Sequence, residues 1–158
     1  MSYIYPAPGV ADAQLTLNIT TSNGTDSDGL DVAALQDVTI NNANDVFTWT
    51  QLDSGSKQQI ATTATNSLSM NLVLDQTTFF GDSTATGEDA QEAGIFGLSK
   101  DKTKIDFSLY LGDTDGGAAG KTITGSGYVT GLAPTVSADA PVWVSPVTIT
   151  VDGDYTVS

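Results

Sequence analysis

Apolar and polar residues alternate with a period of two along much of this chain, and this alternation constrains its fold more than any other feature. The pattern recurs in seven segments: 14–20, 37–41, 45–51, 67–75, 104–111, 121–130 and 147–151. In the clearest of them, 104–111, four large apolar residues alternate with more polar ones. Because successive strand side chains point to opposite faces of a sheet, each segment predicts a half-buried β-strand.

Residues that favour tight turns separate several of these segments. Asn23-Gly24, Asp28-Gly29, Asp53-Ser54-Gly55 and Asp152-Gly153 all supply backbone conformations that hairpin turns need. Short strands that alternate with such turns indicate an antiparallel, mainly β chain.

Residues 88–98 form the one segment whose pattern favours a helix. Two acidic residues occupy its first turn and Lys100 follows its end. On a helix, Ala90, Ala93 and Phe96 would share one face. We therefore predict a mainly β fold, a two-sheet antiparallel β-sandwich or partly closed barrel with one short flanking α-helix.

The length of 158 residues corresponds to one domain, and 39% apolar residues are enough for a core. We assign residues 1–13 to an amino-terminal arm, because Tyr3, Ile4 and Tyr5 lie among prolines and small residues there. Residues 14–158 are predicted to form a single β-sandwich domain.

Two stretches of this domain, 21–36 and 51–66, are polar and weakly periodic. We predict long loops at both places. Compact domains seldom contain such loops unless the loops bind something, so both are candidate contact segments.

The charge of the chain limits its partners. The chain has 17 Asp and 2 Glu but only five Lys, with no Arg and no His, so the formal net charge is −14. Binding to nucleic acid through phosphates needs clustered Lys and Arg, and anionic membranes need the same, so neither partner is expected. No secretory signal or long apolar run is visible, which favours synthesis in a cytoplasm.

The absence of Cys and His excludes most familiar active sites and metal centres. The acidic runs at 26–31 and 113–116 lack the Glu that closes a helix-loop-helix calcium loop, and Asp-Gly turns explain them more simply. No carboxylate pair is singled out for glycoside hydrolysis. We therefore predict a protein that is not an enzyme and has no cofactor.

Sheet edges provide the functional hint. Exposed edges recruit other strands unless charge, bulges or covering segments block them, and Lys, the usual blocker, is scarce here. Trp49 shares a strand face with Phe47, which predicts burial in a core or an interface. We therefore expect copies of the chain to pair with one another, as rings that stack into tubes.

The order of these segments resembles the major tail (tail tube) proteins of tailed bacteriophages, with the long-tailed siphophage type favoured. The resemblance rests on Phe47-Thr48-Trp49, the 68–74 strand, the helix near 88–98, the 105–111 strand and a closing region at 125–153. It covers most of residues 14–157.

The resemblance implies six copies per ring, rings stacked into a hollow tube, and double-stranded DNA that passes through without specific binding. It also implies assembly contacts at the arm, at Tyr3, Ile4 and Tyr5, and near Trp49 and Lys57. Tape measure, baseplate or tip, and terminator proteins would be the other partners. The location implied is the virion tail, after synthesis and assembly in the host cytoplasm.

Two other functions remain open from the sequence. A decoration or adhesion module would need a self-contained sandwich with an exposed aromatic patch, for example around Trp49 and Trp143. A small glycan-active enzyme would need a cleft with a perturbed pair of carboxylates.

Overall fold

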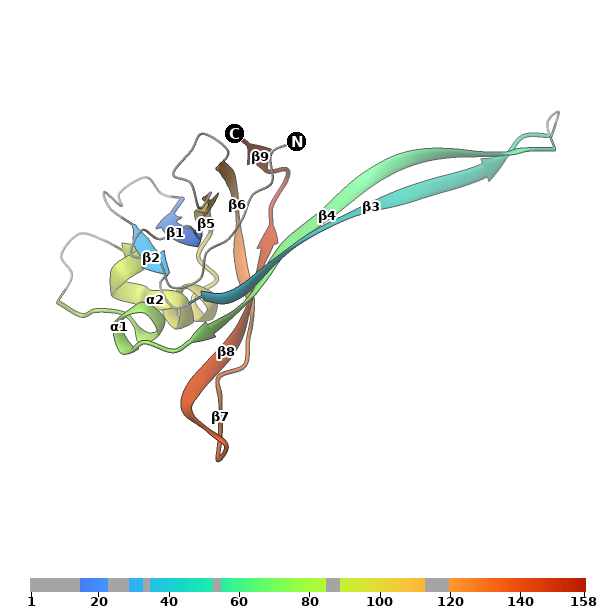
Figure 1. Cartoon of the computed structure of the whole chain (residues 1–158). Coiled ribbons are helices and arrows are strands. Elements are labelled where there is room, and N and C mark those ends of the chain that lie inside the picture. Colours follow the sequence, from blue (N-terminus) through green and yellow to red (C-terminus); the bar gives the residue numbers. More distant parts are fainter. Residues whose placement is uncertain (1–14, 23–28, 33–34, 53–54, 85–88, 113–119) are drawn as a thin grey trace.

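The computed structural model describes residues 15–22, 29–32, 35–52, 55–84, 89–112 and 120–158 (Figure 1). The predicted arm, with Tyr3, Ile4 and Tyr5, lies outside the described residues. The strands are β1 (Leu15–Thr21), β2 (Leu30–Val32), β3 (Leu35–Thr50), β4 (Lys57–Val73), β5 (Ile105–Leu111), β6 (Lys121–Leu132), β7 (Thr135–Ser137), β8 (Ala140–Val151) and β9 (Thr156–Val157). The helices are α1 (Gln76–Phe80) and α2 (Asp89–Lys100).

All of the described strands belong to one antiparallel sheet. Its order is β2-β1-β5-β6-β8-β4-β3, with β7 added to β8 and β9 added to β6. The prediction of a mainly β, antiparallel fold with a short flanking helix is confirmed. The predicted alternatives were a two-sheet sandwich and a partly closed barrel, and the structure has one sheet that bends around its core without closing (Figure 1).

The core lies on one face of this sheet, where α1 and α2 cover it (Figure 1). Strand β5 shows the arrangement most clearly, because Ile105, Phe107 and Leu109 are buried while their neighbours face the other way. The register sets Leu109 opposite Leu17 and Phe107 opposite Ile19 on β1. Cross-strand pairing therefore keeps the apolar residues of adjacent strands on the same face.

Close backbone packing explains a glycine in β6. An added Cβ at Gly127 would lie 2.2 Å from the carbonyl oxygen of Thr150 on β8. Glycines in this strand indicated either a bulge or a nearby backbone. Both are present, since the β6–β8 register also shifts between Val129 and Gly131.

The helices begin and bend where their sequences dictate. Asp75 caps α1 by accepting hydrogen bonds from the backbone N–H groups of Thr77 and Thr78, each at 3.2 Å.

Within α2, Gly94 has φ 63°, which interrupts the helix. This interruption explains why Phe96 is 43% exposed although helical spacing placed it with Ala90, which is fully buried. The prediction that Phe96 shares one face with Ala90 is therefore wrong.

The two predicted loops contain strands. Residues 57–66 belong to β4, so the prediction of a loop over 51–66 is wrong for most of that stretch. The stretch 21–36 includes all of β2, and its residues 23–28 and 33–34 lie outside the described ones. The outer part of β4 looked like a loop because its exposed residues give no alternation of apolar and polar side chains. Strand β2 was missed because it has only three residues, although Leu30 and Val32 are buried.

Candidate assembly surface

A long two-stranded ribbon projects from the body of the molecule (Figure 1). We define the ribbon as residues 41–50 of β3 and 57–65 of β4, in which every residue is exposed. At about 3.3 Å per residue, ten residues of strand extend roughly 30 Å. Because isolated two-stranded hairpins are at best marginally stable in water, this element needs a covering partner.

A bulge twists the ribbon near its middle. Thr62 and Thr63 on β4 together oppose Asp45 on β3, where the register shifts. The Thr63 hydroxyl donates to the Asp45 carboxylate at 3.3 Å, and the Thr62 hydroxyl donates to the Asp45 carbonyl at 3.2 Å. The two bonds hold the bulge in place, and a bulge increases the local right-handed twist.

Large apolar side chains lie exposed on the ribbon. Phe47 is 58% exposed and Ile60, directly opposite it in the register, is 56% exposed. The ring of Trp49 stacks on that of Phe47, with 5.9 Å between centroids. Covering side chains of this size would contribute about 1 kcal/mol each, since complete burial is worth roughly 1.5–3 kcal/mol.

The structure places two of the predicted contact residues on this ribbon. Trp49 pairs with Gln58, so it lies beside Lys57 on the neighbouring strand. Both residues are exposed. Within the chain, Trp49 therefore does not belong to a core, which leaves the interface part of its predicted role as a proposal.

Strand β3 is also an edge of the sheet. It pairs only with β4 in the described part of the chain, so its other side presents unpaired backbone groups. No Lys or Pro interrupts its 16 residues. Long edges without these blockers are templates for pairing with another strand.

A second apolar feature lies at the opposite end of β4. We define the groove as the hollow, about 440 Å³ in volume, lined by Leu74, Asp75, Gln76, Phe80, Pro134 and Trp143. Phe80 is 59% exposed and Trp143 is 52% exposed. Sequence analysis missed this groove, because it joins residues from α1 and β8 that are more than 60 positions apart.

The face of the sheet opposite the core is polar. We define the polar face by the side chains of Asp31, Asp37, Lys104, Asp106, Thr124, Ser126, Thr130, Thr150 and Asp152. Hydroxyl groups bond to each other across strands, at 2.7 Å for Thr124 with Thr156 and 2.8 Å for Thr130 with Thr150. Each of these bonds uses one of the two O–H donors of the pair, which reduces the number of donors that remain free for another molecule.

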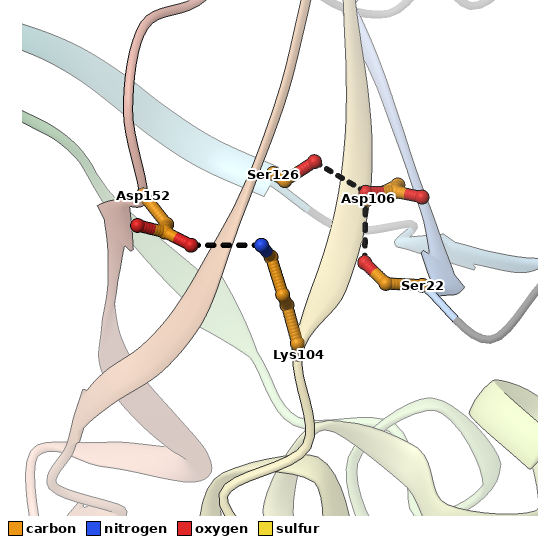
Figure 2. A network of polar contacts seen from close by, with 5 residues as sticks. All are labelled: Ser22, Lys104, Asp106, Ser126 and Asp152. Carbon is orange, nitrogen blue, oxygen red and sulfur yellow. Dashed lines mark hydrogen bonds and ion pairs between the residues drawn. The ribbon is translucent and has the colours of Figure 1, made fainter.

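Carboxylates on the polar face also have partners within the chain. Figure 2 shows Asp106 accepting hydrogen bonds from the hydroxyls of Ser22 and Ser126. Beside them, the Lys104 ammonium lies 2.7 Å from an Asp152 carboxylate oxygen. Hydrogen bonding to Asp152 raises the pKa of Lys104, which therefore stays protonated. The pair is exposed, so it adds little to stability.

The charge of the polar face is negative. Lys104 is the one lysine of the described residues on this face, and Asp152 neutralises it. Asp31, Asp37 and Asp106 add three carboxylates that have only neutral hydrogen-bond partners. The face is thus suited to repel a polyanion rather than to bind one.

The described residues show no arrangement typical of metal or carbohydrate sites. Among them, no group of three or more carboxylates could hold a metal ion. The acidic residues 26, 28, 113 and 115 lie outside this part of the chain. Trp49 lies on the ribbon and Trp143 at the β7 end of β8, so the two do not form one stacking platform (Figure 1).

Neither helix that the structure describes has the length and apolar character needed to span a membrane.

No sequence profile of a known protein family matches this chain, and no curated protein is significantly similar to it in sequence.

Several solved structures share its fold. A chain from the anti-feeding prophage baseplate, 6-fold symmetrised, has a TM-score of 0.63 and 12% identity, over 98% of this chain and 97% of that one. A chain from the tail of an empty gene transfer agent particle with C6 symmetry has a TM-score of 0.60 and 14% identity, over 90% and 95%. A chain of the SPP1 tail tube has a TM-score of 0.59 and 12% identity, over 92% and 77%. The TM-scores show that these chains share a fold. The sequence identities are too low to show a shared function, which must be argued from the surface of the molecule.

Proposed function

We propose that this chain is a structural tail-tube protein, with no catalytic role, whose copies assemble into a hollow tube in a virion tail. The observation on which this depends is the ribbon, a hairpin with large exposed apolar side chains that no described part of the chain covers. The fold supports the proposal, because it is shared with chains of the SPP1 tail tube and of a gene transfer agent tail.

Assembly would use two different surfaces of each copy. The edge strand β3 and the ribbon lie at one end of the sheet order, while β2 lies at the other. A contact between unlike surfaces repeats from copy to copy and closes into a ring when the rotation permits. We propose six copies per ring and stacking of rings, in keeping with the six-fold symmetry named for two of the similar structures.

The polar face would line the channel of this tube. Its carboxylates repel phosphates over roughly one Debye length, about 8 Å at physiological salt. Bonds between its hydroxyls use one O–H donor of each pair, so fewer donors remain for hydrogen bonds to a phosphate backbone. Double-stranded DNA would therefore pass through without specific binding, since binding requires Lys or Arg that release counterions.

The same proposal includes the other partners of a phage tail. A long-tailed phage would supply tape measure, baseplate or tip, and terminator proteins to set the length and the ends of the tube. Synthesis and assembly would take place in the host cytoplasm. The predicted arm, residues 1–13 with Tyr3, Ile4 and Tyr5, would contact the neighbouring ring, as would Trp49 and Lys57.

Electron microscopy of the purified chain at increasing concentration tests the proposal. We expect hollow filaments of uniform diameter. The matched control replaces residues 44–64 with an Asn-Gly turn, which removes the outer ribbon and leaves the core strands intact. This variant should keep the β-sheet circular dichroism of the parent chain and form no filaments. Monomers at every concentration of the parent chain would overturn the proposal.

A further inference from the structure

We infer that the groove beside α1 receives the ribbon tip of a second copy, where the tip is defined as residues 49–52 and 55–58. The inference rests on the proposed assembly and adds its partner surface. A mainly apolar hollow that includes Asp75 is matched by a hairpin tip with two exposed apolar side chains, Trp49 and Leu52, and one basic residue, Lys57.

The groove is held open by contacts within the chain. The N–H of Leu74 donates to the carbonyl of Trp143 at 2.9 Å, which fixes two of its walls together. The N–H of Ala133 donates to the hydroxyl of Ser145 at 3.2 Å, which fixes the backbone next to Pro134. A preformed apolar hollow loses little conformational freedom on binding, as expected of a docking site.

The tip has the chemistry that this hollow would bind. The Leu52 side chain is fully exposed, and Trp49 is 37% exposed beside it on the ribbon. Either side chain could enter an apolar hollow walled by Phe80 and Trp143.

Charge selects the tip among the exposed apolar segments of the chain. Of the described residues that line the groove, Asp75 is the one with a charge. Hydrogen bonds from Thr77 and Thr78 lower its pKa, so it stays ionised. Lys57 is the one lysine on the ribbon within the described residues. The segment between the two halves of the tip also contains Asp53, which lies outside the described residues, so the pairing depends on Lys57 itself and not on the net charge of the tip. The groove thus offers Asp75 as an ionised partner for the Lys57 ammonium.

The tip cannot occupy the groove of its own chain. The ribbon leaves the body at the far end of β3 and β4, whereas α1 follows the opposite end of β4 (Figure 1). Because the ribbon is roughly 30 Å long, its tip lies far from the body of the molecule. The contact must therefore join two copies, and because tip and groove are unlike surfaces, each copy can bind one neighbour and be bound by another.

Crosslinking tests this inference directly, because the chain has no Cys of its own. Chains with Leu52→Cys and chains with Gln76→Cys are mixed under filament-forming conditions and treated with a short bis-maleimide. We expect covalent dimers in the mixture and none from either chain alone. The control mixture pairs Leu52→Cys with Thr124→Cys on the polar face and should give no dimers.

The outcomes separate this inference from the proposed function. Filaments without the Leu52–Gln76 crosslink, or with equal crosslinking to Thr124→Cys, would overturn the docking while the tube stands. Crosslinking of Gln76→Cys to Tyr3→Cys in its place would assign the groove to the amino-terminal segment and would also overturn it. Absence of filaments from the parent chain would overturn the proposed function itself.

A charge exchange gives a second readout. Lys57→Glu should raise the concentration needed for filaments by about tenfold, the effect of a single charge pair. Combining it with Asp75→Asn and Gln76→Lys should restore the original concentration, because the charges are then reversed on both sides. Asn retains the helix cap that Asp75 provides, so α1 is preserved. No rescue by the triple variant would contradict the pairing of tip and groove.

Discussion

Backbone contact, rather than side-chain chemistry, determines the residue at position 127. Gly127 lies where β6 and β8 approach so closely that any Cβ would overlap the Thr150 carbonyl. Gly131 lies four residues along the same strand, yet a Cβ there would meet only the Thr148 side chain at 3.4 Å. Replacing the two glycines should therefore change the free energy of unfolding by different amounts, although the sequence shows no difference between them.

This comparison gives a prediction with its control built in. Gly127→Ala should lower the free energy of unfolding by roughly 2–3 kcal/mol, because the strands must move apart in a packed core. Gly131→Ala should change it by less than about 1 kcal/mol. Urea unfolding followed by circular dichroism measures both. Equal effects of the two substitutions would mean that the close β6–β8 approach does not exist in solution.

The prediction of which α2 side chains share a face failed, because the backbone angle of one glycine changes the spacing of side chains around the helix. The helix at 88–98 was predicted, and α2 lies there. The buried side chains are Ile95 and Leu98 rather than Phe96, because Gly94 interrupts the helical repeat. A single left-handed glycine has no unique sequence signature, so periodicity found the helix and missed its buried face.

At the scale of elements, α1 depends on its cap. Asp75 accepts hydrogen bonds from the Thr77 side chain and from the Thr78 backbone, and the first of these is the larger cause of its lowered pKa. A lowered pKa in the folded state means that the ionised carboxylate stabilises the fold. That stabilisation is fully present above the ordinary value of 3.8 and is lost as the pH falls through the lower folded pKa.

Asp75→Ala should therefore lower the Tm by a few degrees at neutral pH, through loss of the cap. The difference from the parent chain should shrink as the pH falls below 3.8. Asp75→Asn, which keeps the cap without the charge, should have a smaller effect at neutral pH. Thermal unfolding of the three proteins between pH 7 and pH 2.5 measures this, and a difference that does not vary with pH would contradict the role of the charge.

Element-scale prediction succeeded where one strand face is buried. Alternation located β1, β5 and β6 within one or two residues of their bounds. The β3 half of the outer hairpin was predicted as a strand at 45–51, and β3 lies there. The β4 half was predicted as a loop, because both of its faces are exposed and its Thr and Gln residues look polar. The short helix α1 was missed as well, although Asp75 followed by two threonines is a recognisable start.

At the scale of the whole molecule, strand order joins segments that are distant in sequence. Strand β8 lies between β6 and β4, and β5 lies between β1 and β6. Periodicity identifies the buried face of a strand but not its neighbours, which is why a two-sheet sandwich and a partly closed barrel both stayed open from the sequence. The same strand order gathers the scattered Asp, Ser and Thr residues onto the polar face.

The proposed channel lining gives a prediction at this scale. In particles built from this chain, Lys in place of Asp31, Asp37 and Asp106 should slow genome ejection, because a basic wall binds phosphates through released counterions. The control exchanges Glu92, Asp101 and Asp139 for Lys, which gives the same net charge on exposed residues outside the polar face. Ejection should be normal in the control. Normal ejection in both would contradict the lining.

The most direct test of the central claim is a helical reconstruction by cryo-electron microscopy of filaments formed by the purified chain. The account predicts a hollow tube whose channel is lined by the polar face around Asp106 and Thr124, with each ribbon buried against another copy. A filament with no channel, a channel lined by α1 and α2, or a ribbon left exposed to solvent would contradict it.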